Sequence, residues 1–256
     1  MKIIIGIPAR MGSSRFPGKP LKKILGKSMI EHVYKRCLLA ESVDDVFVAT
    51  CDEEIKLEVE SFGGVAYMTE KNISRPGLRV ASACEQMNLS DDDIVVVVQG
   101  DEPLVYPQMI DIAVKPLIED SKIKLLTLIA NANETEWNDP NEVKVTIDIN
   151  KDILMMSRSP IPSNYWDIVG PRYKQVAIMP FRKKFLIDFQ NMPPTSLELA
   201  EQIELMRAVE SNIKVRTAIS TFNTVSVDTE PDLVEAENTM ISDPIYQKYK
   251  DTKNEK

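Results

Sequence analysis

The chain has 256 residues, of which 43% are hydrophobic and 27% are charged, a composition typical of a globular protein with a large core. Its formal net charge of -8 argues against a general nucleic-acid binder, because no overall basic field is present to neutralise phosphates. The opening apolar run of about six residues is far shorter than the ~20 that a membrane span requires, and no signal-peptide cleavage site follows it.

The cysteines and the histidine exclude further kinds of chemistry. Cys37, Cys51 and Cys84 are odd in number, widely spaced and without a CxxC pair, so we expect reduced thiols in a cytoplasmic protein rather than disulfides or a zinc site. His32 is the only histidine, which argues against a histidine-based metal site or catalytic triad. It falls on the apolar side of a predicted helix, where we expect it to be buried.

Strands and helices are predicted to alternate through the first half of the chain. Residues 2–7 form a continuous apolar run typical of a buried parallel strand, and Ser28 followed by Glu31 is a capping box that predicts a helix over 29–39. Further strands are expected at 46–50, 65–69, 93–100 and 125–130, with helices at 52–63, 81–87 and 109–118. This order predicts a doubly wound α/β fold with a mainly parallel sheet.

The rhythm changes from about residue 131. We expect a hairpin from 143–149 and 153–157, helices over 181–190 and 197–211, strands at 213–219 and 225–229, and a last helix over 232–240. Residues 246–256 form a charged tail that is expected to fray. We therefore expect a single domain over residues 1–245, with 131–225 as an inserted subregion.

The first loop concentrates positive charge and turn residues. The stretch IPARMGSSRFPGKPL (residues 7–21) carries Arg10, Arg15 and Lys19 among glycines and serines, directly after the first strand. Open α/β sheets bind ligands at this end of their strands, and such a loop lets backbone N–H groups approach an oxyanion. Neither GxGxxG nor GxxxxGK[ST] is present. The loop predicts an anion site, the alternative being a solvated loop with chance basic residues.

Carboxylates follow two further predicted strands. Asp101 and Glu102 lie in QGDEP (99–103), and Asp228 lies in VDT (227–229). Carboxylates at strand ends suit Mg²⁺ bound to a substrate phosphate, with Asp101 the better candidate ligand. The alternatives are that Asp101 caps a turn and that Asp228 begins a helix. In the second region, Lys144 or Arg158 could bind an anionic second substrate or be a surface charge, and Arg158, before a Pro-x-Pro turn, is favoured.

These segments together resemble the 3-deoxy-manno-octulosonate (Kdo) cytidylyltransferase family of sugar nucleotidyltransferases. The matching stretches run in the family's order from residue 3 to about 240: IPARMGSSRFPGKPL, IEHVYKR, VFVATCDEEI, VVVQGDEPLV, DPNEVKV, SRSPIP and VDTEPDLVEAE. The resemblance implies a three-layer, Rossmann-like nucleotidyltransferase fold, a homodimer and Mg²⁺ as cofactor. It also implies attack of an acidic sugar's hydroxyl on the α-phosphate of CTP, with release of pyrophosphate, in surface polysaccharide or lipopolysaccharide synthesis.

The resemblance also implies roles for individual residues. Catalysis would rest on Arg10, Lys19, Asp101 and Asp228, the two aspartates binding the metal. Residues implied to bind the nucleotide are Pro8, Ala9, Arg10, Ser13, Lys19, Arg79 and Gly100. Those implied to bind the sugar are Gln99, Arg158, Gln175 and Glu204.

Three departures from the family pattern stand out, the first in a stretch that the resemblance assigns to the nucleotide pocket and the other two on the sugar side. The SGT(D/E)R stretch appears as ISRPGLRVA (73–81), with Arg79 in register; HLGIYGYR appears as QVAIMPFR, with Gln175 in place of histidine; and LEQLR appears as IELMR, with Leu205 in place of glutamine. A pocket that hydrogen-bonds a polyol loses discrimination when its polar groups become apolar. We therefore expect a modified octulosonate, another acidic sugar or another small acid rather than Kdo itself. The alternatives are a different nucleotide and a catalytically silent nucleotide-binding relative.

Overall fold

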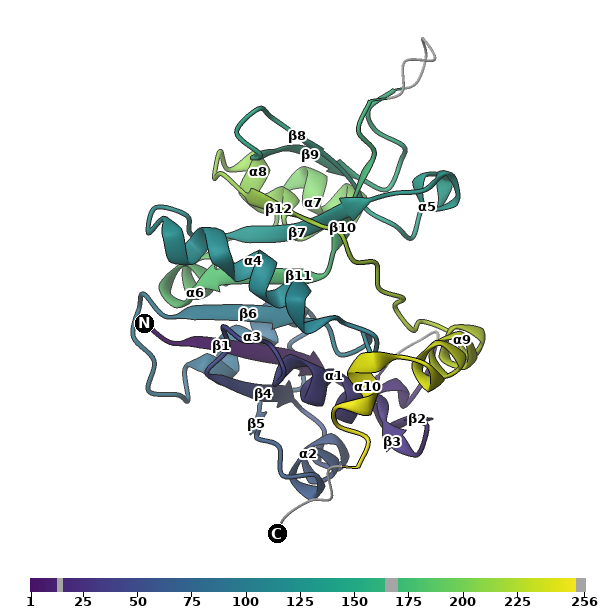
Figure 1. The fold of residues 1–256 in the computed structure, drawn as a ribbon. Coiled ribbons are helices and arrows are strands. Elements are labelled where there is room, and N and C mark those ends of the chain that lie inside the picture. Colours follow the sequence, from purple (N-terminus) through teal and green to yellow (C-terminus); the bar gives the residue numbers. More distant parts are fainter. Residues whose placement is uncertain (13–15, 164–169, 252–256) are drawn as a thin grey trace.

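Two five-stranded sheets form the centre of the molecule in a computed structural model that describes residues 1–12, 16–163 and 170–251 (Figure 1). In the first sheet, four strands are parallel and β11 runs antiparallel to β6 at one edge. Its order is β11 (Ile178–Arg182), β6 (Ile94–Val98), β1 (Ile3–Ala9), β4 (Asp45–Thr50) and β5 (Ala66–Met68). The parallel sheet predicted from the alternation of apolar runs and helices is confirmed.

The second sheet is mostly antiparallel and continues the first. Its order is β12 (Arg216–Ser220), β7 (Leu126–Asn131), β10 (Tyr173–Val176), β8 (Lys144–Ile147) and β9 (Ile153–Ser157), with only β12 and β7 parallel. The Arg182 N–H donates to the Lys124 carbonyl at 2.9 Å, which ties β11 to the start of β7. Because β11 belongs to the first sheet, residues 131–225 contribute to both sheets.

Helices cover both faces of the first sheet, giving three layers. One apolar cluster lies between the sheet and α1 (Met29–Cys37), α2 (Glu53–Ser61) and α4 (Pro107–Glu119). The other lies under α3 (Pro76–Cys84), α6 (Lys183–Gln190) and α8 (Met206–Glu210). Helix α3 packs directly on β1, because a Cβ at Gly6 would lie 2.4 Å from a Val80 methyl group. This close packing fixes the start of α3 beside the end of β1.

The remaining elements are short or peripheral. They comprise a 3₁₀ turn (Lys19–Leu21), β2 (Lys23–Ile24), β3 (Lys27–Ser28), α5 (Glu134–Asn138), α7 (Ser196–Glu201), α9 (Glu230–Ile241) and α10 (Pro244–Gln247). Helix α1 begins as expected, with the Ser28 hydroxyl accepting from the Glu31 N–H. Within the described residues, no helix is both long and apolar enough to cross a bilayer.

Several expected elements differ from the structure. The helix expected over 197–211 is two helices, α7 and α8, because Gln202 adopts a left-handed conformation (φ 56°) that ends α7. The strand expected over 225–229 is not formed. Helix α3 begins five residues before the expected start, with Pro76 in its first turn, where a missing N–H costs nothing. The strands β10 and β11 were not expected.

The end of the described chain is packed rather than frayed. Tyr249 is 3% exposed, and its hydroxyl contacts Nδ1 of His32 at 2.8 Å. His32 is fully buried on α1, as predicted, with Nε2 2.8 Å from the Ile24 carbonyl oxygen. Arg36 and Asp243 form a buried ion pair beside them. The charged tail therefore begins after Tyr249.

Candidate functional site

The loop after β1 is folded back by two backbone interactions. The Met11 N–H donates to the Asp52 carboxylate at 2.8 Å. Asp52 is the residue just before α2, and its side chain does not cap that helix. Gly18 has a φ of +70°, and its N–H donates to the Met11 carbonyl at 3.2 Å. A left-handed residue is needed there, which explains a glycine at this position. The return of the chain places Lys19 at the start of the 3₁₀ turn.

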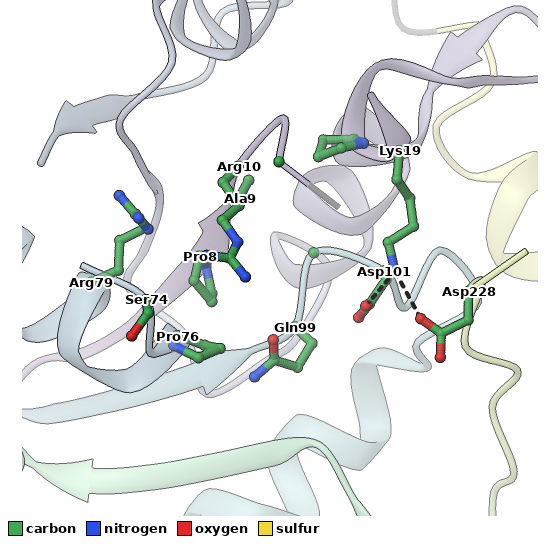
Figure 2. A pocket seen from close by; sticks show the side chains of 13 residues that line it. Pro8, Ala9, Arg10, Lys19, Ser74, Pro76, Arg79, Gln99, Asp101 and Asp228 are labelled. Carbon is green, nitrogen blue, oxygen red and sulfur yellow. Dashed lines mark hydrogen bonds and ion pairs between the residues drawn. The ribbon is translucent and has the colours of Figure 1, made fainter. Parts of the chain in front are cut away.

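Lys19 joins two carboxylates that are distant in the sequence. Its Nζ atom lies 2.7 Å from Asp101, at the end of β6, and 3.1 Å from Asp228, just before α9 (Figure 2). The lysine side chain is only 12% exposed, so the three charges interact in partly desolvated surroundings. The structure thus brings together the two aspartates that the sequence predicts as metal ligands.

The pKa of Lys19 reflects these contacts. Burial by itself would lower the pKa of the ammonium group, but the charges and hydrogen bonds of Asp101 and Asp228 outweigh burial and raise it above its ordinary value. Lys19 is therefore a permanent cation at neutral pH. Such a group suits electrostatic stabilisation better than proton abstraction.

A cavity of about 310 Å³ opens beside this group of charges. Figure 2 shows Arg10 and Arg79 on one side of it and Lys19 with its two aspartates on the other. The cavity is lined by Pro8, Ala9, Arg10, Gly12, Lys19, Pro20, Ser74, Pro76, Arg79, Gln99, Gly100, Asp101 and Asp228. It therefore lies at the carboxyl ends of β1 and β6, where parallel sheets bind their ligands.

Nearly all the residues predicted to bind the nucleotide line this cavity. They are Pro8, Ala9, Arg10, Lys19, Arg79 and Gly100, whereas Ser13 lies outside the described residues. Arg79 is 3% exposed, and its guanidinium donates to the carbonyls of Glu70 and Ile73. It therefore also shapes the loop before α3. Ser74, Pro76 and Pro20 line the cavity without having been predicted, because their position depends on how that loop and α3 pack.

The four residues predicted to bind the sugar are not brought together. Gln99 lines the nucleotide-side cavity, whereas Gln175 lines a second cavity of about 530 Å³ and donates to the Thr127 hydroxyl at 3.2 Å. Arg158 and Glu204 line neither of these two cavities.

The side chain of Arg158 is bound to backbone carbonyls, whereas Oε1 of Glu204 is buried without a hydrogen-bond partner among the described residues. Arg158 donates through Nε to the Glu201 carbonyl at 2.9 Å and through Nη1 to the Pro140 carbonyl at 3.0 Å. Burial raises the pKa of Glu204, which lies beneath the start of α3 near Gly77. Lys144, the other predicted anion-binding candidate, is fully buried, and its Nζ donates to the carbonyls of Asp139 and Glu142.

Glu102, the second candidate metal ligand, does not line the cavity that holds Lys19 and Asp101. It is 5% exposed and lines the second cavity, where its two carboxylate oxygens accept hydrogen bonds from Thr224 and Ser226. Burial, assisted by the charge of Asp101, raises the pKa of Glu102 to about 7. In the sequence, the only sign of the contact with Glu102 is the spacing of Thr224 and Ser226, two hydroxyl residues that lie two apart just before Asp228.

The chemistry of the Asp101–Asp228 pair suits a divalent cation. In the described part of the chain, no group of three or more histidine, cysteine or acidic side chains is arranged to hold a metal ion. Mg²⁺ characteristically takes only one or two protein carboxylates and completes its shell with water and substrate phosphates. Asp101 and Asp228 both lie within 3.1 Å of the Lys19 ammonium nitrogen, so they are close enough together to share one cation. The cavity beside them has further cations that could bind the phosphates.

Comparisons with known proteins agree on one family. A family model described as cytidylyltransferase matches residues 3–215. An 8-amino-3,8-dideoxy-manno-octulosonate cytidylyltransferase of Shewanella pealeana is 42% identical over 235 residues, covering 91% of this chain and 96% of the relative. A 3-deoxy-manno-octulosonate cytidylyltransferase of Geobacter metallireducens is 40% identical over 245 residues, covering 91% and 95%.

Solved structures give the same result. The structure of a CMP:2-keto-3-deoxy-manno-octonic acid synthetase complexed with CTP is similar with a TM-score of 0.89 at 34% identity, covering 94% of this chain and 99% of that one. A 4-diphosphocytidyl-2C-methyl-D-erythritol synthase from Anaerococcus prevotii has a TM-score of 0.62 at 14% identity, a likeness of fold alone. The resemblance and the nucleotidyltransferase fold predicted from the sequence are confirmed.

Proposed function

The chain belongs to the cytidylyltransferase family, and we propose that it transfers CMP from CTP to the hydroxyl of an octulosonate. The names of the relatives make the 8-amino analogue of Kdo a candidate acceptor, and also Kdo itself, which the replacements at Gln175 and Leu205 had argued against. The observation that carries this proposal is the contact of Lys19 with both Asp101 and Asp228 at the edge of a cation-lined cavity. Both relatives described above act, by their names, on an eight-carbon 3-deoxy sugar acid. We place the product in surface polysaccharide or lipopolysaccharide synthesis.

The reaction exchanges one phosphorus–oxygen bond for another. The acceptor hydroxyl oxygen bonds to the α-phosphorus of CTP, the bond from that phosphorus to the bridging oxygen breaks, and pyrophosphate leaves with release of the hydroxyl proton. Little covalent chemistry falls to the protein in such a transfer, so its contribution is positioning and electrostatic stabilisation.

The cavity provides the groups that phosphoryl chemistry requires. We propose that Arg10 and Lys19 bind the triphosphate, with Pro8, Ala9 and Gly100 forming the wall against the nucleoside and Arg79 shaping it. Asp101 and Asp228 would hold Mg²⁺, which when bound neutralises charge on the phosphate oxygens. Lys19 then lies between the carboxylates and the phosphates, where it stabilises negative charge that grows on the leaving pyrophosphate.

The acceptor is assigned to the side of the cavity next to β6. Gln99 lines the cavity two residues before Asp101, so we propose that it contacts the acceptor directly. Gln175, held by Thr127 at the second cavity, is proposed to influence which acceptor is selected. Arg158 and Glu204 are proposed to support the acceptor side from outside these cavities, since Arg158 fixes the carbonyls of Pro140 and Glu201.

We further propose that the enzyme is a homodimer. Leu154 on β9, an edge strand, is 60% exposed, and Leu199 on α7 is 58% exposed. The two elements are close together, because the Arg158 N–H that follows β9 donates to the Glu201 carboxylate at the end of α7. An exposed edge strand beside exposed leucines is a surface that a second copy can cover. Light scattering after gel filtration measures the mass directly.

The proposed location is the cytoplasm. Cys37, Cys51 and Cys84 are free thiols, which is the state expected of cysteines in a reducing compartment.

Pyrophosphate release measures the proposed reaction. Purified protein would be mixed with each of the four NTPs, with Mg²⁺ or EDTA, and with Kdo, 8-amino-Kdo, a sialic-type acid or a small phosphonate. We expect release only with CTP, Mg²⁺ and an octulosonate, and a CMP–sugar product by mass spectrometry. Release with another nucleotide or acceptor would reassign the substrate, and nucleotide binding without release in any combination would indicate a catalytically silent relative.

A further inference from the structure

The segment that carries Asp228 has no regular secondary structure. It crosses from β12 in the second sheet to α9 beside the first, and Figure 1 draws it as an extended run without helix or strand. No strand ladder therefore sets the position of Asp228. One backbone hydrogen bond, from the Val227 N–H to the Asp101 carbonyl at 2.9 Å, links the segment to the turn after β6.

Glu102 provides two further polar contacts between this segment and that turn. Its Oε2 accepts from the Thr224 hydroxyl at 2.8 Å, and its Oε1 accepts from the Ser226 hydroxyl. The two donors lie two residues apart, so a single carboxylate holds the segment at two points, four residues and two residues before Asp228. At 5% exposure the carboxylate is shielded from water, which makes these hydrogen bonds stronger than they would be on the surface.

The apolar packing beneath these bonds favours the same arrangement. Val227 is fully buried in a cluster with Leu104, Phe16 and Ile24. Leu104 follows Glu102 by two residues, so both sides of the junction are anchored, the turn by Leu104 and the segment by Val227. On either side of Val227, the Ser226 hydroxyl donates to the carboxylate of Glu102, and the Asp228 carboxylate contacts Lys19.

We propose that Glu102 is a positioning residue that fixes the 224–228 segment against the turn after β6, and so sets the separation of Asp101 and Asp228. The inference rests on the proposed function, since it gives those aspartates their role as metal ligands. Glu102 is not assigned as a third ligand, because among the described residues no group of three acidic side chains is arranged to hold a metal ion. Residues that orient metal ligands typically change metal affinity by about 10–100-fold when removed.

The affinity of CTP with and without Mg²⁺ tests this role apart from activity. Isothermal titration of the full chain with CTP, in Mg²⁺ and in EDTA, gives the gain in affinity that the metal provides. We expect Glu102→Ala to reduce that gain by about tenfold or more while leaving the affinity in EDTA nearly unchanged. Glu102→Gln keeps one acceptor oxygen and is expected to lose less.

A second experiment removes the donors of the same hydrogen bonds instead of the acceptor. Thr224→Val combined with Ser226→Ala removes both donors at positions that are not buried, so the test stands even if Glu102→Ala does not fold. We expect the same loss, and no further loss when Glu102→Ala is added, because the three side chains form one unit. Glu31→Gln is the matched control, a carboxylate that is 7% exposed and paired with Lys27 away from the cavity.

The outcomes separate this inference from the proposed function. An unchanged metal-dependent gain in folded Glu102→Ala or in the hydroxyl variants would overturn the positioning role, as would effects that add fully. A loss of CTP affinity that is equal in Mg²⁺ and EDTA would also overturn it, since that result indicates general distortion. If the wild-type protein neither binds CTP nor releases pyrophosphate, the proposed function itself fails, and the inference with it.

Discussion

Lys19 and Asp101 connect the loop after β1 to the end of β6 through a contact of 2.7 Å between Nζ and a carboxylate oxygen. This contact closes the cavity on one side and leaves the positive charge of Lys19 next to the space that the triphosphate would occupy. The same nitrogen atom reaches Asp228 at 3.1 Å, so one cation compensates two acids. Its removal takes away the cation that both carboxylates contact.

Lys19→Met is therefore expected to reduce kcat by about 10²–10³-fold, the usual effect of removing one group that stabilises transition-state charge. The KM for CTP should rise less, because Arg10 remains available for ground-state binding. Steady-state pyrophosphate release measures both constants. Lys23→Gln is the control, since its side chain is 54% exposed and paired with Glu58. A Lys19→Met enzyme with near-normal kcat would remove Lys19 from the mechanism.

Asp101→Asn and Asp228→Asn are each expected to lower turnover by at least about 100-fold while the protein remains folded. An amide keeps the shape of the side chain but neither the charge nor the affinity for a hard cation. The measurements are pyrophosphate release over a range of Mg²⁺ concentrations and thermal unfolding. Asp188→Asn, a substitution on the exposed face of α6, should change nothing. Normal activity in both site variants would contradict the metal assignment.

The nucleotide side of the site could be predicted because its residues follow strand ends. Arg10 and Asp101 follow the buried strands β1 and β6, and Lys19 lies in the loop after β1. Parallel strands bring their carboxyl ends to one edge. Local sequence and a general rule of α/β topology are sufficient for that inference. The partner of Lys19 in the far part of the chain, Asp228, was found through the resemblance more than through its own local pattern.

The acceptor side could not be predicted in the same way, because there the role of a side chain depends on its tertiary contacts. Arg158 is a cation before a rigid turn in the sequence, but backbone carbonyls take its donors in the fold. Residues 225–229 alternate apolar and polar like a strand, but in the structure they form no strand, and the Val227 N–H donates to the Asp101 carbonyl. Glu102 has the composition of a metal ligand, and its orientation is decided by Thr224 and Ser226.

Gln175→His is expected to change the choice of acceptor. Gln175 donates to Thr127 and stands where the resembling family has a histidine that contacts the sugar. The substitution should alter the ratio of kcat/KM for Kdo to that for 8-amino-Kdo by about tenfold, a typical effect of one polar contact on discrimination, with the KM for CTP unchanged. Gln86→His on the exposed surface is the control. An unchanged ratio would show that Gln175 takes no part in acceptor selection.

The stability of the protein is expected to fall as the pH drops from 7 to 5, in part because of His32. Burial lowers the pKa of this imidazole from 6.5 to about 4, and the hydrogen bond to the Ile24 carbonyl offsets this only in part. Between pH 4 and pH 6.5, His32 is protonated in the unfolded chain but neutral in the folded protein. The contribution of His32 to stability is thus complete above pH 6.5 and is lost as the pH falls toward 4.

The expected loss from this one group is about 2 kcal/mol between pH 7 and pH 5. Urea unfolding at several pH values measures it as the difference in slope between wild type and His32→Gln. The variant is less stable at pH 7, because it loses the contacts with Tyr249 and Ile24, but its stability should depend less steeply on pH over this range. Carboxylates that titrate nearby contribute equally to both proteins and cancel in the difference. Parallel pH profiles for the two proteins would mean that His32 accepts a proton in the folded state as readily as in the unfolded chain, and that Tyr249 does not seal it from water.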